Sequence, residues 1–253
     1  MLAALALEGL PDVRPGDDLA KLIVDALRGP ELPFTAGDVL VVAHKVISKA
    51  EGRLRKLQEV RPTALAKELA AEHGKDPRHV QVVLDESQSL LRAAHGVLIC
   101  VTHHGFVCAN AGVDASNAPD QDTVVLLPRD PDASARTLRR RIRALTGEAP
   151  AIVITDSFGR AWRHGQTDVA IGCAGLQPLE DWRGSTDATG RELRATWIAV
   201  ADELAGTADL ARTKDSFQPA VLLRGAGRHV TADDGPGAGA LLRPESEDLF
   251  RQR

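Results

Sequence analysis

Two aspartates with small or hydroxylated neighbours offer the clearest chemistry in the sequence. Asp114 lies within AGVDAS, Asp156 is followed by Ser157, and each acid comes after a predicted strand. Carboxylate and hydroxyl oxygens are ligands of hard cations, and Mg²⁺ usually takes one or two carboxylates together with substrate phosphates. The pattern therefore indicates a site for Mg²⁺ or Mn²⁺. The alternative is that both acids belong to turns, because Asp-Ser and Asp-Ala-Ser are common turn-forming sequences.

Other reactive side chains are less specific. Lys49 follows a predicted strand, where it is either a phosphate-binding charge or a solvated surface lysine. Cys108 has apolar neighbours, which is typical of a buried thiol and not of a nucleophile. The adjacent His103 and His104 would point to opposite faces of a strand, which argues against a shared metal. The arginines at 139–143 are interpreted as a solvated helix face, and no GxxxxGK[ST] phosphate loop is present.

Apolar patterns predict the elements that must position these groups. Residues recur at helical spacing in some segments and form short continuous apolar runs of strand length in others. We predict helices over 19–27, 61–72, 80–94, 132–146 and 192–210, and strands over 39–43, 96–101, 106–109, 151–155 and 219–224. The segment 159–190 has little periodicity. Because the order is not a regular βαβ series and no Gly-rich fingerprint follows a strand, an α+β (mixed α/β) fold without a Rossmann motif is expected.

Length and composition narrow the class of protein. The 253 residues can bury a sizeable core, and the net charge of −4 makes nucleic acid a poor candidate partner. The cysteines are Cys100, Cys108 and Cys173, an odd number in apolar settings, which indicates reduced thiols and a cytoplasmic protein. Neither a signal peptide nor a membrane span is predicted. One unit over residues 1–253 is expected, with a partly ordered tail over 231–253.

Several segments, in order along the chain, resemble the coenzyme F420:gamma-L-glutamyl ligase family, including the N-terminal ligase domain of its actinobacterial fused form. The match runs from about residue 9 to 225, so it is more specific than any single motif. The segments are GLPDVRPGDDL (9–19), DVLVVAHKVISKAEGR (38–53), GFVCANAGVDASN (105–117), LLPRDPDASA (126–135), ITDSFGRAWRHGQTDVAIG (154–172), GREL (190–193) and VADEL (200–204).

The resemblance implies an acid–amino-acid ligase that uses GTP in coenzyme F420 biosynthesis. GTP would phosphorylate the terminal carboxylate of the deazaflavin precursor F420-0, and the amine of L-glutamate would then displace phosphate; a gamma-linked glutamate would be added to F420-1 in the same way. A carboxylate and an amine need such a leaving group because they do not form an amide usefully in water. The family also implies two divalent cations (Mg²⁺ or Mn²⁺), a potassium ion as a further candidate, and a homodimer of two intertwined mixed α/β subdomains.

The family's site residues fall on named positions of this chain. Asp114, Asp156 and Ser157 match the cation ligands, and Lys49 joins Asp114 and Asp156 as a catalytic candidate. The implied GTP contacts are Leu10, Pro11, Asp12, Val13, His44, Lys45, Lys49 and Asn117, with Arg212, Thr213 and Lys214 in the segment that wraps the nucleotide.

This chain departs from the family pattern in three places. One is Thr189, where relatives often have Tyr before the Gly-Arg-Glu-Leu motif. Many relatives carry Thr where Ser157 stands, which preserves the oxygen ligand. Some relatives have Met-Gly-Glu where this chain has Arg212, Thr213 and Lys214, so a lysine replaces a carboxylate of the second cation site and becomes a candidate phosphate contact. Two alternatives stay open: a metal-dependent GTP phosphohydrolase that uses the same acids, and a non-catalytic nucleotide- or deazaflavin-binding protein.

Overall fold

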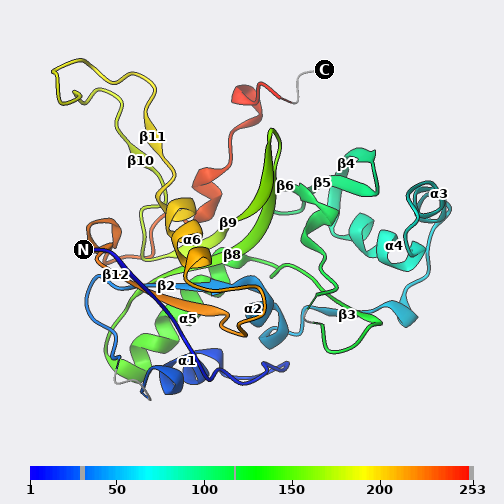
Figure 1. Ribbon diagram of the computed structural model, residues 1–253, viewed down its shortest axis with the longest axis horizontal. Coiled ribbons are helices and arrows are strands. Elements are labelled where there is room, and N and C mark those ends of the chain that lie inside the picture. The colour runs from blue at the N-terminus through cyan, green and yellow to red at the C-terminus, as the bar shows by residue number, and fades with distance from the viewer. Residues whose placement is uncertain (29–31, 117, 251–253) are drawn as a thin grey trace.

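The predicted α+β architecture is confirmed by the computed structural model, which describes residues 1–28, 32–116 and 118–250 (Figure 1). A central sheet has the strand order β1-β12-β2-β8-β9, and smaller sheets are formed by β3-β7, β4-β5-β6 and β10-β11. In the central sheet only β2 and β8 run parallel. The strands are β1 Ala3–Ala6, β2 Val39–Ala43, β3 Leu54–Lys56, β4 Ser87–Ala94, β5 Val97–Thr102, β6 Val107–Ala109, β7 Thr123–Val125, β8 Ala151–Arg160, β9 Arg163–Ala174, β10 Glu180–Asp181, β11 Trp197–Ile198 and β12 Ala220–Arg224.

Helices cover both faces of the central sheet. In β2, Leu40 and Val42 join the hydrophobic cluster with α1 and α5, while Val39 and Val41 join the cluster with α6. Side chains alternate across a strand, so a strand buried on both faces is a continuous apolar run, as VLVVA is. Each fully buried aliphatic side chain contributes about 1.5–3 kcal/mol. The helices are α1 Leu19–Arg28, α2 His44–Ala50, α3 Ala64–His73, α4 Pro77–Asp85, α5 Pro131–Thr146 and α6 Val200–Leu210.

A separate hydrophobic cluster supports a second lobe beside the central sheet (Figure 1). It packs α3 and α4 on the β4-β5-β6 sheet, with Val80, Val83 and Leu98 fully buried. Both helices carry the signals expected of their ends: Thr63 and Asp76 cap the first turns of α3 and α4, and Gly74 ends α3 in the left-handed conformation. This lobe carries Asp114 to the edge of the central sheet.

The helix predicted over 80–94 is wrong in its second half. The helix α4 ends at Asp85, and the chain continues as β4, which pairs antiparallel with β5. Register shifts between Ser87 and Ser89 and between Leu90 and Arg92 interrupt the two-residue alternation. The half-buried positions therefore recur every three residues, at Ser87, Leu90 and Ala93, which imitates the spacing of an amphipathic helix.

Three other expectations need correction. The strand predicted over 151–155 continues to Arg160 and returns as the 12-residue β9, which lies in the segment read as non-periodic. The helix predicted over 192–210 is shorter, because α6 begins only at Val200. Arg139 is buried, not solvated: its guanidinium donates to the carbonyl oxygens of Thr231 and Ala232 and pairs with Asp234. No helix in the described part of the chain has the length and apolar character needed to cross a membrane.

The contact between β9 and the start of α5 gives a stability prediction. A Cβ added at Gly172 would lie 2.5 Å from the carbonyl carbon of Pro131. Because that atom is backbone, Gly172→Ala must displace α5, and we expect the free energy of unfolding to fall by about 1–3 kcal/mol in urea denaturation. Gly159→Ala, where nothing lies within 4 Å, is the matched control and should change it by less than about 0.5 kcal/mol. Equal effects of the two substitutions would contradict this packing.

Candidate active site

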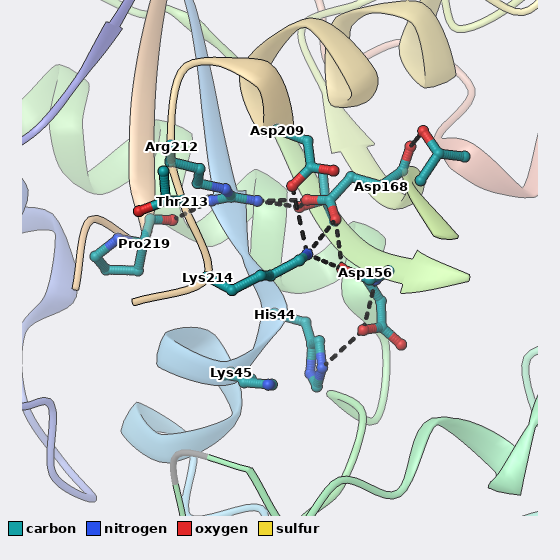
Figure 2. Close-up of polar contacts among 12 residues, drawn as sticks. His44, Lys45, Asp156, Asp168, Asp209, Arg212, Thr213, Lys214 and Pro219 are labelled. Carbon is teal, nitrogen blue, oxygen red and sulfur yellow. Dashed lines mark hydrogen bonds and ion pairs between the residues drawn. The ribbon is translucent and has the colours of Figure 1, made fainter. Parts of the chain in front are cut away.

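The parallel pairing of β2 and β8 brings two distant polar segments together. Ala43 lies opposite Thr155, so the next residues, His44 and Asp156, meet where β2 ends and its pairing with β8 stops. The Nε2 atom of His44 lies 3.3 Å from Oδ1 of Asp156 (Figure 2). This contact lacks hydrogen-bond geometry, and within the described chain the buried Nε2 atom has no hydrogen-bond partner. A buried polar atom beside the Asp156 carboxylate is thus left without a hydrogen bond.

A cavity of about 580 Å³ lies at this edge of the sheet. Its volume is within the usual range for small-molecule sites. Except for Asn117, which lies outside the described residues, every site residue predicted from the sequence lines it. They are Leu10, Pro11, Asp12, Val13, His44, Lys45, Lys49, Asp114, Asp156, Ser157, Arg212, Thr213 and Lys214.

The second lobe contributes Asp114 to this cavity. An isolated bridge to Val125 holds its backbone, and its carboxylate accepts a hydrogen bond from the Ser116 N–H at 2.6 Å. The ammonium of Lys45, on α2, lies 2.7 Å from the same carboxylate and links the lobe to the sheet. Burial raises the pKa of Asp114, but the hydrogen bonds from Lys45 and Ser116 lower it by more, so the pKa lies below the usual value and the group is ionised at neutral pH.

Lys49 is buried and not a solvated surface lysine. Its ammonium donates to Oδ1 of Asp12 at 2.8 Å, and this contact ties the loop before α1 to α2. The Asp12 side chain is 74% exposed, so another anion can replace its carboxylate as the partner of Lys49. A second anion entering the cavity would therefore meet a lysine that is already oriented.

Asp168, on β9, is a buried site residue that the sequence analysis missed. It lies opposite Ser157 in the β8-β9 ladder and accepts hydrogen bonds from Ser157 Oγ at 2.6 Å and Thr155 Oγ1 at 2.9 Å. The guanidinium of Arg212 pairs with the same carboxylate (Figure 2). Burial raises the pKa of Asp168, but these donors lower it by more, so the carboxylate stays ionised. The available signal in the sequence was a single acid directly before the apolar run VAIGCA.

Residues 211–219, which we call the strap, connect α6 to β12 across the cavity. Arg212 anchors the strap by donating to the Pro219 carbonyl and to Thr155 Oγ1, besides its pair with Asp168. Two residues later, the ammonium of Lys214 reaches Ser157 Oγ at 2.7 Å. The cavity therefore combines carboxylates from the strands with cations from α2 and the strap.

Comparison with known proteins assigns the family. The model of the F420-0:gamma-glutamyl ligase family matches residues 9–225. The chain is 47% identical to the coenzyme F420:L-glutamate ligase of Methanopyrus kandleri and 43% identical to that of Methanothermobacter thermautotrophicus, with 99% of both chains covered in each case. It is 44% identical to the protein of the same name from Archaeoglobus fulgidus, over 97% of this chain and 95% of that one. This chain belongs to the F420-0:gamma-glutamyl ligase family.

The resemblance to this ligase family implies two divalent cations. The side chains present suit one of the two cation sites and not the other. No group of three or more His, Cys, Asp or Glu side chains in the described residues is arranged to hold a metal alone. Asp156, beside the unpartnered Nε2 of His44, nevertheless suits a hard cation that takes further ligands from a phosphate. The hydroxyl of Ser157 does not fit, because it already donates to Asp168 and accepts from Lys214.

Cys108, the thiol nearest the site in sequence, is excluded as a nucleophile of this ligase. Burial, and to a smaller extent the charge of Asp156, raises its pKa to about 12. We expect the folded protein to resist iodoacetamide at pH 8 at Cys100, Cys108 and Cys173, all of which are buried, and to react at all three in urea. Mass spectrometry of the alkylated protein measures this, and rapid labelling of Cys108 in the folded state would contradict the burial.

Proposed function

We propose that this protein is a GTP-dependent ligase that joins L-glutamate to the terminal carboxylate of coenzyme F420-0, and a gamma-linked glutamate to F420-1. The observation that carries the proposal is the composition of the single cavity described above. It gathers four cationic side chains, Lys45, Lys49, Arg212 and Lys214, around carboxylates that suit a cation. Cations and carboxylates at one site are what a bound nucleoside triphosphate requires. The names of the relatives support F420 and glutamate as the other substrates.

The proposed reaction has two steps. An oxygen of the F420-0 carboxylate attacks the γ-phosphorus of GTP, the bond from that phosphorus to the β,γ-bridging oxygen breaks, and GDP leaves with the electron pair. The glutamate amine then attacks the acyl carbon of the acyl phosphate, the bond from carbon to the phosphate oxygen breaks, and phosphate leaves while the nitrogen loses a proton. The first step creates the leaving group that amide formation in water otherwise lacks.

The residues of the cavity have distinct roles in this scheme. Lys49 and Lys45 are placed to neutralise phosphate oxygens, since both ammonium groups are already oriented by carboxylates at 2.8 and 2.7 Å. Asp114 and Asp156 would hold a divalent cation, Mg²⁺ or Mn²⁺, which supplies Lewis-acid stabilisation of the charge on the phosphoryl group. The strap, anchored by Arg212, would limit the access of water to the acyl phosphate.

Product mass tests the proposed reaction. The protein is incubated with F420-0, L-glutamate, GTP and Mg²⁺ or Mn²⁺, and the deazaflavin product, GDP and phosphate are measured together. We expect a mass gain of one glutamyl unit for each GDP, and a loss of turnover when ATP replaces GTP. Phosphate release without that mass gain would instead support the phosphohydrolase, and nucleotide binding without turnover would support the non-catalytic alternative.

The assembly expected from the family is a further part of the proposal. We propose a homodimer, and the exposed Trp182 and Trp197 on the projecting β10-β11 arm support an additional contact surface (Figure 1). Light scattering at micromolar concentration would test it, and a monomer mass would contradict it. The potassium ion and the cytoplasmic location stay predictions from the sequence.

A further inference from the structure

The ammonium of Lys214 lies within a cluster of oxygen atoms. It donates to Ser157 Oγ at 2.7 Å, lies 3.4 Å from Oδ1 of Asp209 and 3.8 Å from Oδ1 of Asp168. Figure 2 shows the lysine reaching from the strap toward these acids, which come from α6 and β9. Two carboxylates and a hydroxyl are the donors that a hard cation would take. In this chain the ammonium of Lys214 lies among these oxygen atoms, where a metal ion could otherwise bind.

The charges on this side of the cavity are already balanced. Asp168 is paired with Arg212, and Asp209 is paired with Lys214. The Ser157 hydroxyl donates its only hydrogen to Asp168, and its oxygen accepts a hydrogen bond from the ammonium of Lys214. A divalent cation placed here would meet a fixed positive charge and no surplus of negative charge.

The other side of the cavity differs. No lysine or arginine among the described residues lies within 4 Å of the Asp156 carboxylate, which contacts the Nε2 atom of His44 at 3.3 Å. Its orientation is held by a hydrogen bond from the Ser157 N–H at 2.8 Å. Negative charge without a chain cation is what a divalent ion can use. The two halves of the cavity are therefore unequal as cation sites.

We propose that Lys214 is the second cation of this site and binds the terminal phosphate of the nucleoside triphosphate, so that the protein uses one divalent cation and not two. The inference deepens the proposed function and rests on it for the identity of the nucleotide. The geometry supports this use of the lysine. Arg212 fixes the strap through a buried pair, while the Lys214 side chain is 72% exposed at the cavity mouth, where a phosphate can reach its ammonium.

The number of bound metal ions tests this inference. Full-length protein is titrated with Mn²⁺ in the presence of guanosine 5′-(β,γ-imido)triphosphate, and bound Mn²⁺ is counted by electron paramagnetic resonance. We expect one Mn²⁺ per chain in the wild type and two in Lys214→Glu, which returns a carboxylate to this side. Lys67→Glu, at an exposed position of α3, makes the same charge change elsewhere and should leave the count at one. Two ions in the wild type, or one in Lys214→Glu, overturns the inference.

A second variant covers the case in which Lys214→Glu does not fold. Lys214→Met removes the ammonium and keeps the length of the side chain, and we expect it to bind the same GTP analogue about 10- to 100-fold more weakly. Unchanged affinity would overturn the role of the lysine. Glutamyl transfer accompanied by two Mn²⁺ would sink this inference alone, whereas one Mn²⁺ per nucleotide-bound chain without glutamyl transfer would sink only the proposed function.

Discussion

Asp156→Asn is expected to lower kcat for glutamyl transfer by about 100- to 1000-fold while the fold is retained. The substitution keeps the size of the side chain and its contact with the Ser157 N–H, and it removes one negative charge. Because no lysine or arginine is paired with this carboxylate in the described structure, its charge is the one most available to a bound metal. Product mass per unit time at saturating Mg²⁺ measures the effect.

Asp187→Asn is the matched control for this substitution. Asp187 lies between β10 and β11 and does not line the cavity, and its Oδ1 accepts backbone hydrogen bonds that an asparagine oxygen can also accept. We expect normal turnover in this variant. Turnover of Asp156→Asn close to the wild-type value at saturating metal would show that Asp156 is not a cation ligand, and circular dichroism would establish that both variants are folded.

Asp168→Ala is expected to lower the free energy of unfolding by about 3–5 kcal/mol. The loss of this carboxylate leaves the Arg212 guanidinium buried without its counter-ion and removes the acceptor of the Thr155 and Ser157 hydroxyls. The cost arises mainly from the uncompensated charge and not from the value of the pair itself. Urea denaturation followed by circular dichroism provides the measurement.

The exposed pair of Asp181 and Arg183 is a control with the same chemistry. Arg183 donates to both oxygens of Asp181, but the two side chains, Asp181 and Arg183, are 41% and 49% exposed. Asp181→Ala should therefore cost less than about 1 kcal/mol. The double variant Asp168→Ala with Arg212→Leu should recover part of the stability, because no charge is left unpaired. Similar losses in Asp168→Ala and Asp181→Ala would mean that burial of the pair has no consequence.

Asp156 and Asp168 differ in how well the sequence around them predicts a site residue. Asp156 follows the apolar run AIVIT and precedes a serine, so its neighbours indicate a polar group directly after a buried strand segment. Asp168 lies in text rich in glycine, arginine and histidine that has no strand periodicity at its start. Only its pairing opposite Ser157 makes it part of the site. A ladder partner 11 residues away is visible once the hairpin exists and not before.

Local sequence patterns predicted most of the elements whose burial and end signals lie within their own residues. The helix α1 follows from buried residues at helical spacing and from Asp18, which accepts from the Lys21 N–H. The strand β2 follows from its continuous apolar run. Where a bulge changed the period, as in β4, the same reasoning failed, because side-chain spacing reports burial and burial depends on the partner strand.

The sequence by itself determined the chemical inventory of this protein: carboxylates and hydroxyls that suit a hard cation, lysines that are candidates for phosphate binding, and thiols in apolar settings, in an order along the chain that identifies a ligase family. Tertiary structure alone decided which of these groups meet. The parallel register of β2 and β8 places His44 beside Asp156, and the strap carries Lys214 to a hydroxyl 57 residues away. Such contacts depend on strand pairing and on the packing of two lobes, which no local propensity encodes. The sequence made Lys214 a candidate phosphate contact, and only the folded chain placed its ammonium beside Ser157, Asp209 and Asp168.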